Sequence, residues 1–142
     1  MSGTGHTVKS YEEEMQSLND NLVMMGSLTE NQMADAMAAV IKVDKESVDK
    51  IVKNDGKINE LRSTIDNQIT TVLVKRAPMA VDLRITISTM KISHDLERIG
   101  DLAKSVAKKV KPLPVDLPDE LIGSLRRLGA VSYTHLRAHE TQ

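Results

Sequence analysis

Residues 75 to 84, Lys-Arg-Ala-Pro-Met-Ala-Val-Asp-Leu-Arg, form the bend that decides the fold. Pro78 pushes Ala77 out of the α region and so ends one helix. A second helix is expected to open at Ala80 or Asp82. Apolar residues recur at helical spacing on both sides of the bend, which predicts two amphipathic helices that fold back on each other.

Three long helices are predicted, each of roughly 30 residues, or about 45 Å at 1.5 Å per residue. Asp44 is the expected N-cap of the helix before the bend, and its predicted core residues are Val48, Ile51, Val52, Ile58, Leu61, Ile65, Ile69 and Val72. Those of the helix after the bend are Ile85, Ile92, Leu96, Ile99, Ala103, Val106 and Val110. The N-terminal helix changes register near Gly26, and its predicted core residues are Val8, Tyr11, Met15, Leu18, Leu22, Met25, Met33, Met37 and Val40.

The predicted fold class is all-α, an elongated antiparallel three-helix bundle. Residues 1–110 form this first bundle, and a proline-containing linker follows at 111–118. Residues 119–130 begin a fourth amphipathic segment, interpreted as the start of a truncated second bundle whose apolar residues have no partner of their own. The lysines from Lys104 to Lys111 are expected to form a solvated helix end.

Residues 131–142, VSYTHLRAHETQ, differ abruptly in composition from the rest of the chain. They show no helical or strand periodicity and closely resemble an in-frame translation of a sequencing-library adapter. We therefore expect a non-native tail, with a short disordered C-terminus as the alternative, and exclude its histidines as ligands.

Composition excludes several classes of function. The 142 residues contain no Cys, which removes disulfides, zinc-thiolate sites and thiol catalysis. A net charge of -1 with no Trp or Phe and two Tyr argues against nucleic-acid binding. The N-terminus lacks a signal peptide and no segment is apolar enough for membrane insertion, so a cytoplasmic protein is expected.

One acidic pair in the predicted helices sits at the repulsive i,i+4 spacing, Glu97 and Asp101. They share a helix row with Met90 and His94. A matching row before the bend holds Asp55, Asn59, Arg62 and Asp66. We call the four carboxylates of Asp55, Asp66, Glu97 and Asp101 the acidic ridge.

Equal rise along two helices folded at position 78 places Asp55 level with Asp101 and Asn59 level with Glu97. Four oxygen-bearing side chains at one height suit a hard cation such as Mg²⁺, Mn²⁺ or iron, with Zn²⁺ also considered, and His94 is a further candidate ligand. The predicted metal site is therefore Glu97, Asp101, Asp55 and Asn59.

A plainer interpretation stays open beside the metal site. The acids are then solvated and bridged by Arg62 and Arg98, His94 is an ordinary half-exposed histidine, and Gly100 marks a tight helix contact rather than the approach of a ligand. No glycine-rich phosphate loop, HExxH or ExxH motif, or nucleophile elbow is present, so no enzyme is predicted.

Two stretches resemble the PhoU family of bacterial phosphate-signalling proteins. They are Lys75–Arg84 and the run Met90-Lys-Ile-Ser-His-Asp-Leu-Glu-Arg-Ile-Gly-Asp101. Residues 54–66 and the start at His6 are also similar to that family. The resemblance implies a protein of two bundles, and its E/DxxxD metal motifs correspond to Glu97 and Asp101, and to Asp55 with the non-acidic Asn59.

The resemblance implies a metal-binding adaptor without catalytic activity that restrains phosphate uptake and phosphate-starvation signalling. The implied partners are the ATPase of the phosphate ABC transporter and the associated sensor histidine kinase, with a homodimer expected for the full-length protein. Two alternatives remain open: a metal-storage or metal-dependent catalytic helical protein, and a purely structural helical interaction module.

Overall fold

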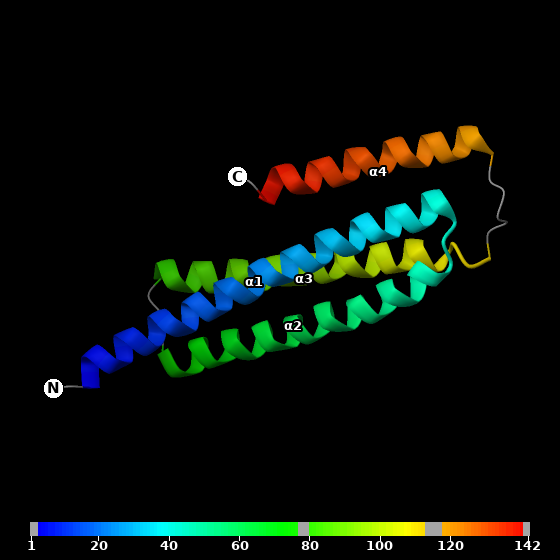
Figure 1. Ribbon diagram of the computed structural model, residues 1–142. Helices are drawn as coiled ribbons and strands as arrows, with labels where there is room; N and C mark the ends of the chain where they lie inside the picture. The colour runs from blue at the N-terminus through cyan, green and yellow to red at the C-terminus, as the bar shows by residue number, and fades with distance from the viewer. Residues whose placement is uncertain (1–2, 77–79, 113–117, 141–142) are drawn as a thin grey trace.

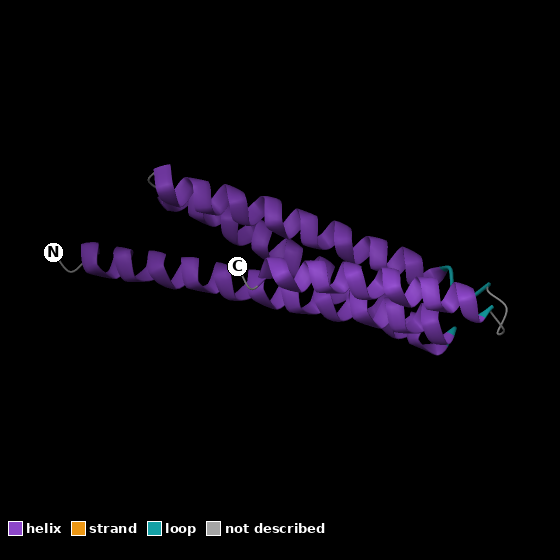
Figure 2. Cartoon of the chain, turned by 90° about the horizontal axis from the view of Figure 1, so that it is seen from above, coloured by secondary structure: helices purple, strands orange, loops and turns teal. Residues whose placement is uncertain are grey.

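The computed structural model describes residues 3–76, 80–112 and 118–140, apart from some side chains near both ends. Most of these residues lie in four helices: α1 (Gly3–Lys42), α2 (Glu46–Arg76), α3 (Ala80–Lys108) and α4 (Asp119–Glu140). The described residues contain no strand, so the all-α prediction is confirmed (Figure 2). None of their helices is long and apolar enough to cross a membrane.

The first three helices form the predicted elongated antiparallel bundle (Figure 1). α1 contacts both α2 and α3, and α4 lies along α1 on the side away from α2. The predicted bend at residues 77–79 lies outside the described residues, but α2 ends at Arg76 and α3 begins at Ala80, as expected. Asp44 caps α2, since its Oδ1 accepts from the backbone nitrogens of Glu46 at 3.1 Å and Ser47 at 3.4 Å.

Helix α2 buries the apolar stripe that its sequence predicts. Its buried aliphatic residues are Val48, Ile51, Ile58, Ile65, Ile69 and Val72. Leu61 is half-buried, and Val52 corrects the prediction because it lies at the edge of the stripe, 38% exposed. The i, i+3 and i, i+4 spacing of these branched side chains gives one continuous face for α1 and α3 to cover.

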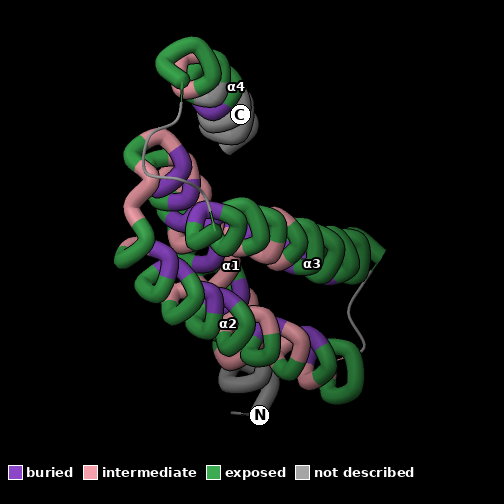
Figure 3. Tube along the Cα trace, turned by 90° about the vertical axis from the view of Figure 1, so that its right-hand side faces the viewer, coloured by how far each residue is buried: buried purple, intermediate pink, exposed green. Residues whose placement is uncertain are grey.

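Helix α3 forms as predicted but turns a different face inward. Ile85, Ile92 and Val106 are exposed by 48%, 47% and 41%, which corrects their assignment to the core. Leu96 and Ile99 are half-buried, and Ala103 and Val110 are buried as expected. The buried residues within α3 are Thr86, Thr89, Ser93, Gly100, Ala103 and Ala107, and Figure 3 shows α3 exposed along much of its length.

Small side chains explain this inversion, because they allow α3 to approach α1 and α2 closely. The three buried hydroxyls are hydrogen-bonded within their own helix: Thr86 to the carbonyl of Asp82 at 2.7 Å, Thr89 to that of Ile85, and Ser93 to that of Met90, both at 2.9 Å. A buried hydroxyl with such a partner carries little desolvation cost.

The second half of α1 also differs from its prediction. Leu18, Met25 and Val40 are buried as expected, whereas Met33 and Met37 are half-buried and line an apolar groove of about 240 Å³ beside α3 and α4. The inward positions in this half are Thr29, Gln32, Ala36 and Ala39. The predicted core residue Val8 lies outside the described side chains.

Helix α4 continues through residues 131–140, although their sequence shows no helical periodicity. Gly129 is buried against Met37, where an added Cβ would lie 2.5 Å from the Met37 Cε. Leu121 and Leu128 are 46% and 63% exposed. The non-native origin of the tail stays a prediction.

Candidate functional site

A buried polar layer joins α1, α2 and α3 near the middle of the bundle. Gln32 of α1 donates its Nε2 to Asp55 Oδ1 of α2 at 3.0 Å and to the Gly100 carbonyl of α3 at 2.8 Å. Asn54 donates its Nδ2 to Gln32 Oε1 at 2.9 Å. Gln32 is fully buried and Asp55 is 2% exposed, so these bonds form where water does not compete.

Gly100 is what lets Gln32 reach across this layer. A Cβ at this position would lie 3.3 Å from Ile58 Cδ1 and 3.5 Å from Gln32 Nε2, tighter than or close to ordinary packing. The tight helix contact that the sequence left open as one alternative is therefore present.

Lys104 supplies the positive charge for the buried Asp55. Its Nζ lies 2.8 Å from Asp55 Oδ2 and 3.8 Å from Asp101 Oδ1. The hydrogen bond to Asp55 raises the pKa of Lys104 above its ordinary value, against the opposing effect of burial. Asp55 and Asp101 thus lie within reach of one shared cation, as their equal height predicts, and that cation is an ammonium group of the chain itself.

This arrangement corrects the expectation that Lys104 belongs to a solvated helix end. Its side chain is 25% exposed and points back into the bundle, toward Asp55. Lys111 fits the expectation better, because it pairs with Asp49 at 3.0 Å while the two side chains remain 53% and 77% exposed.

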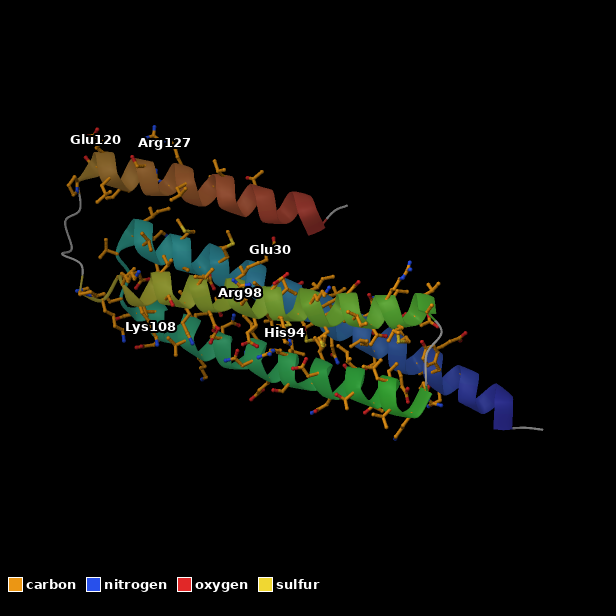
Figure 4. The ribbon with its side chains drawn as sticks, turned by 180° about the vertical axis from the view of Figure 1, so that it is seen from behind. Glu30, His94, Arg98, Lys108, Glu120 and Arg127 are labelled. Carbon is orange, nitrogen blue, oxygen red and sulfur yellow. The ribbon has the colours of Figure 1, made fainter. Side chains whose placement is uncertain are left out.

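Arg62 neutralises the other two carboxylates of the acidic ridge, those of Glu97 and Asp66. Its guanidinium lies 2.9 Å from Glu97 Oε2 and 3.7 Å from Asp66 Oδ2. His94, labelled in Figure 4, lies on the side of α3 toward α2. Its Nε2 lies 3.1 Å from the same guanidinium and 3.6 Å from Asp66 Oδ1. Within the described part of the chain, Arg98 makes no ion pair with these acids.

The predicted metal ligands therefore meet cations of the chain. Asn59 turns its Nδ2 toward Asp55 Oδ2 at 3.4 Å and so acts as a donor there. Asp55 already accepts from Gln32, Lys104 and Asn59. Among the described residues, no three His, Asp or Glu side chains gather as a metal site requires. In this arrangement the ridge does not fit a divalent cation, which would have to displace Lys104.

Sequence reasoning missed Gln32, Asn54 and Lys104. A signal existed for Lys104, which follows Asp101 by three residues and so shares its helix face. No local pattern identified Gln32, which stands immediately before the predicted core residue Met33.

A further groove lies elsewhere, between α1 and α2. Its volume is about 460 Å³ and its lining is polar: Ser10, Glu13, Glu14, Ser17, Thr64, Asn67, Gln68 and Thr71. Gln68 bonds to Ser17 across the groove at 2.9 Å, and Arg76 of α2 reaches Glu14 in the lining at 3.0 Å.

The fold and the site together place this protein in the class of elongated helical-bundle proteins. Its acidic ridge is neutralised by Lys104 and Arg62 of the same chain. The PhoU domain model matches residues 22–110 of this sequence. The chain belongs to the PhoU family.

Individual relatives agree with this assignment. A phosphate-specific transport system accessory protein PhoU homolog of Caulobacter vibrioides is 37% identical over 94% of this chain and 59% of its own length. A protein of the same name from Xylella fastidiosa is 37% identical over 93% of this chain and 55% of its own length. The crystal structure of PhoU from Pseudomonas aeruginosa superposes with a TM-score of 0.79 at 30% identity, covering 89% of this chain and 61% of that one. The chain thus spans a little over half the length of these relatives.

Proposed function

We propose that this protein acts in the regulation of phosphate uptake and phosphate-starvation signalling, as a cytoplasmic adaptor without catalytic activity. The observation that carries the proposal is its 37% identity, over 94% of the chain, to a protein named as an accessory of phosphate-specific transport. The proposed partners are the ATPase of the phosphate ABC transporter and its sensor histidine kinase, and the full-length protein is proposed to be a homodimer.

The bundle supports an adaptor role because it is cross-linked through its centre. Gln32 ties α1 to both other helices, Lys104 ties α3 to α2, and Arg62 ties α2 to α3. Such interhelical bonds limit sliding of one helix along another. A partner would then meet a surface of fixed shape, which lowers the entropic cost of docking.

A gene deletion with complementation tests this proposal. A reporter for phosphate starvation is measured in phosphate-rich medium, with the gene present, deleted, and restored in full. We expect the deletion to switch the reporter on and the restored gene to switch it off. If deletion of the gene does not change the reporter signal, the alternative of a purely structural helical interaction module would be favoured.

A second measurement addresses the partners directly. The purified protein is titrated against the transporter ATPase and against the cytoplasmic part of the kinase, with an unrelated helical bundle of similar charge as the control. Saturable binding to either partner supports the adaptor role. Binding to neither, with an intact regulatory phenotype, would require another route of signalling.

A further inference from the structure

We infer that Lys104 and Arg62 take the place of metal ions on this acidic ridge, so that the ridge is held together without metal. This inference does not depend on the proposed phosphate role. It concerns only how four carboxylates from α2 and α3 are neutralised.

The first step is the position of the Lys104 ammonium. It lies 2.8 Å from Asp55 Oδ2 and 3.8 Å from Asp101 Oδ1, between the two carboxylates that equal helix rise brings to one height. A cation shared by Asp55 and Asp101 would need the same space. An ammonium and a divalent ion cannot both occupy it, because two cations so close repel each other strongly.

The second step is the state of the Asp55 oxygens. Oδ1 accepts from Gln32 at 3.0 Å, and Oδ2 accepts from Lys104 at 2.8 Å and Asn59 at 3.4 Å. Asp55 is 2% exposed, whereas Ca²⁺ and Mg²⁺ sites use several oxygen ligands, and Mg²⁺ usually keeps several waters as well. Both oxygens of this buried carboxylate are therefore already engaged by donors of the chain.

The arrangement of one cation between an acid of α2 and an acid of α3 occurs a second time along the ridge. Arg62 lies 2.9 Å from Glu97 Oε2 and 3.7 Å from Asp66 Oδ2, so it also serves one acid from each helix. A guanidinium suits this task because its fork of N–H donors matches carboxylate oxygens. Lys104 and Arg62 thus each neutralise one carboxylate from α2 and one from α3, so the pairing at Lys104 is not an isolated contact.

The consequence is a latent cation site that Lys104 closes. Replacing Lys104 by Met keeps a long side chain and good helix propensity but removes the charge. Asp55 and Asp101 would then lack a cation, and a divalent ion gains access through the space beside Asp101, whose side chain is 49% exposed.

The test is calorimetric titration of the chelator-treated 142-residue chain with MnCl₂ and MgCl₂, together with its unfolding temperature with and without Mn²⁺. The matched control is Lys111→Met, which removes a lysine from an exposed pair with Asp49. We expect no saturable binding at millimolar metal for the wild type and Lys111→Met. Lys104→Met should bind Mn²⁺ at least about tenfold more tightly, since one nearby positive charge is gone.

Two results would overturn the inference: micromolar Mn²⁺ or Mg²⁺ binding by the wild type at the ridge, abolished by Asp55→Asn, or no gain for Lys104→Met over Lys111→Met. If Lys104→Met does not fold, Lys104→Gln replaces it. The unfolding temperature of the wild type tests the inference independently of any Lys104 variant. A clear rise of this temperature with Mn²⁺ that is lost in Asp55→Asn would contradict the inference that Lys104 occupies the cation position.

Discussion

Helices α2 and α3 have similar lengths and both carry an aliphatic stripe, yet they use it in opposite ways. α2 turns Ile58 and Ile65 inward until both are fully buried. α3 leaves Ile85 and Ile92 about half exposed and buries Thr and Ser residues instead. An apolar stripe thus identifies a helix face that favours burial, but it does not say which face packs within the same chain.

The difference follows from what each helix must fit. α3 approaches the polar layer where Gln32 bonds to the Gly100 carbonyl, and a large side chain at this height would force the helices apart. α2 meets the same layer through Asp55, whose carboxylate accepts from Gln32, and places the larger Ile58 side chain against Gly100. Side-chain size at the contact, and not hydrophobicity, therefore decides the orientation of α3.

Truncating one isoleucine on each helix should give the largest difference in the free energy of unfolding between the aliphatic face of α2 and that of α3. Ile58→Ala removes a fully buried side chain and should lower the free energy of unfolding by about 3 kcal/mol, from lost burial and the cavity left behind. Ile92→Ala removes one that is 47% exposed and should change it by less than about 0.5 kcal/mol.

Denaturant unfolding followed by circular dichroism measures both variants. A loss of 2 kcal/mol or more for Ile92→Ala, within the ~2–5 kcal/mol range of buried Ile→Ala changes, would mean that α3 packs with its aliphatic face inward. The described orientation would then be wrong.

The next largest effect should come from the charge that joins the two helices. Lys104→Met leaves the Asp55 carboxylate buried without its counter-ion and should cost up to about 3 kcal/mol, the lower end of the range because Lys104 is 25% exposed. Adding Asp55→Asn should recover much of this loss, since no buried charge remains. Metal-free unfolding curves of the single and double variants give the coupling, and additive losses would show that the pair does not interact.

The sequence predicts some of these features well and others poorly, for identifiable reasons. The α2 stripe, the Asp44 cap and the common height of Asp55 and Asp101 all follow from local rules of helix geometry. The inward face of α3 does not, because an Ile row and a Thr-Gly-Ala row alternate on one helix. The role of Gln32 was not predicted because its partners lie on α2 and α3, and no local sequence pattern indicates a hydrogen bond across the bundle.

A pair of glycine substitutions tests the close approach of α3 more finely. Gly56→Ala in α2 meets nothing within 4 Å and should stabilise the protein by about 1 kcal/mol through helix propensity. Gly100→Ala brings the same gain, but its Cβ would lie 3.3 Å from the buried Ile58 and crowd the Gln32 bond, so a net loss of about 1 kcal/mol is expected. Equal stabilisation by both changes would show that the helices are not in tight contact there.

The smallest effect concerns whether α2 is also held to α1 by charge, as it is held to α3. A hydrogen bond from the Arg76 guanidinium holds the pKa of Glu14 below its ordinary value, outweighing the effect of burial. A depressed carboxyl pKa stabilises the fold above the ordinary value of 4.5 and loses that contribution as the pH falls through the folded-state pKa. Glu14→Gln should therefore lower the unfolding temperature slightly at pH 7 and flatten its fall as the pH drops below 4.5. Glu13→Gln, an exposed neighbour on α1, is the matched control. Parallel pH profiles for the two variants would show that the ion pair between Arg76 and Glu14 contributes nothing measurable, so that α1 is held to α2 by apolar packing and uncharged hydrogen bonds such as that of Gln68 to Ser17.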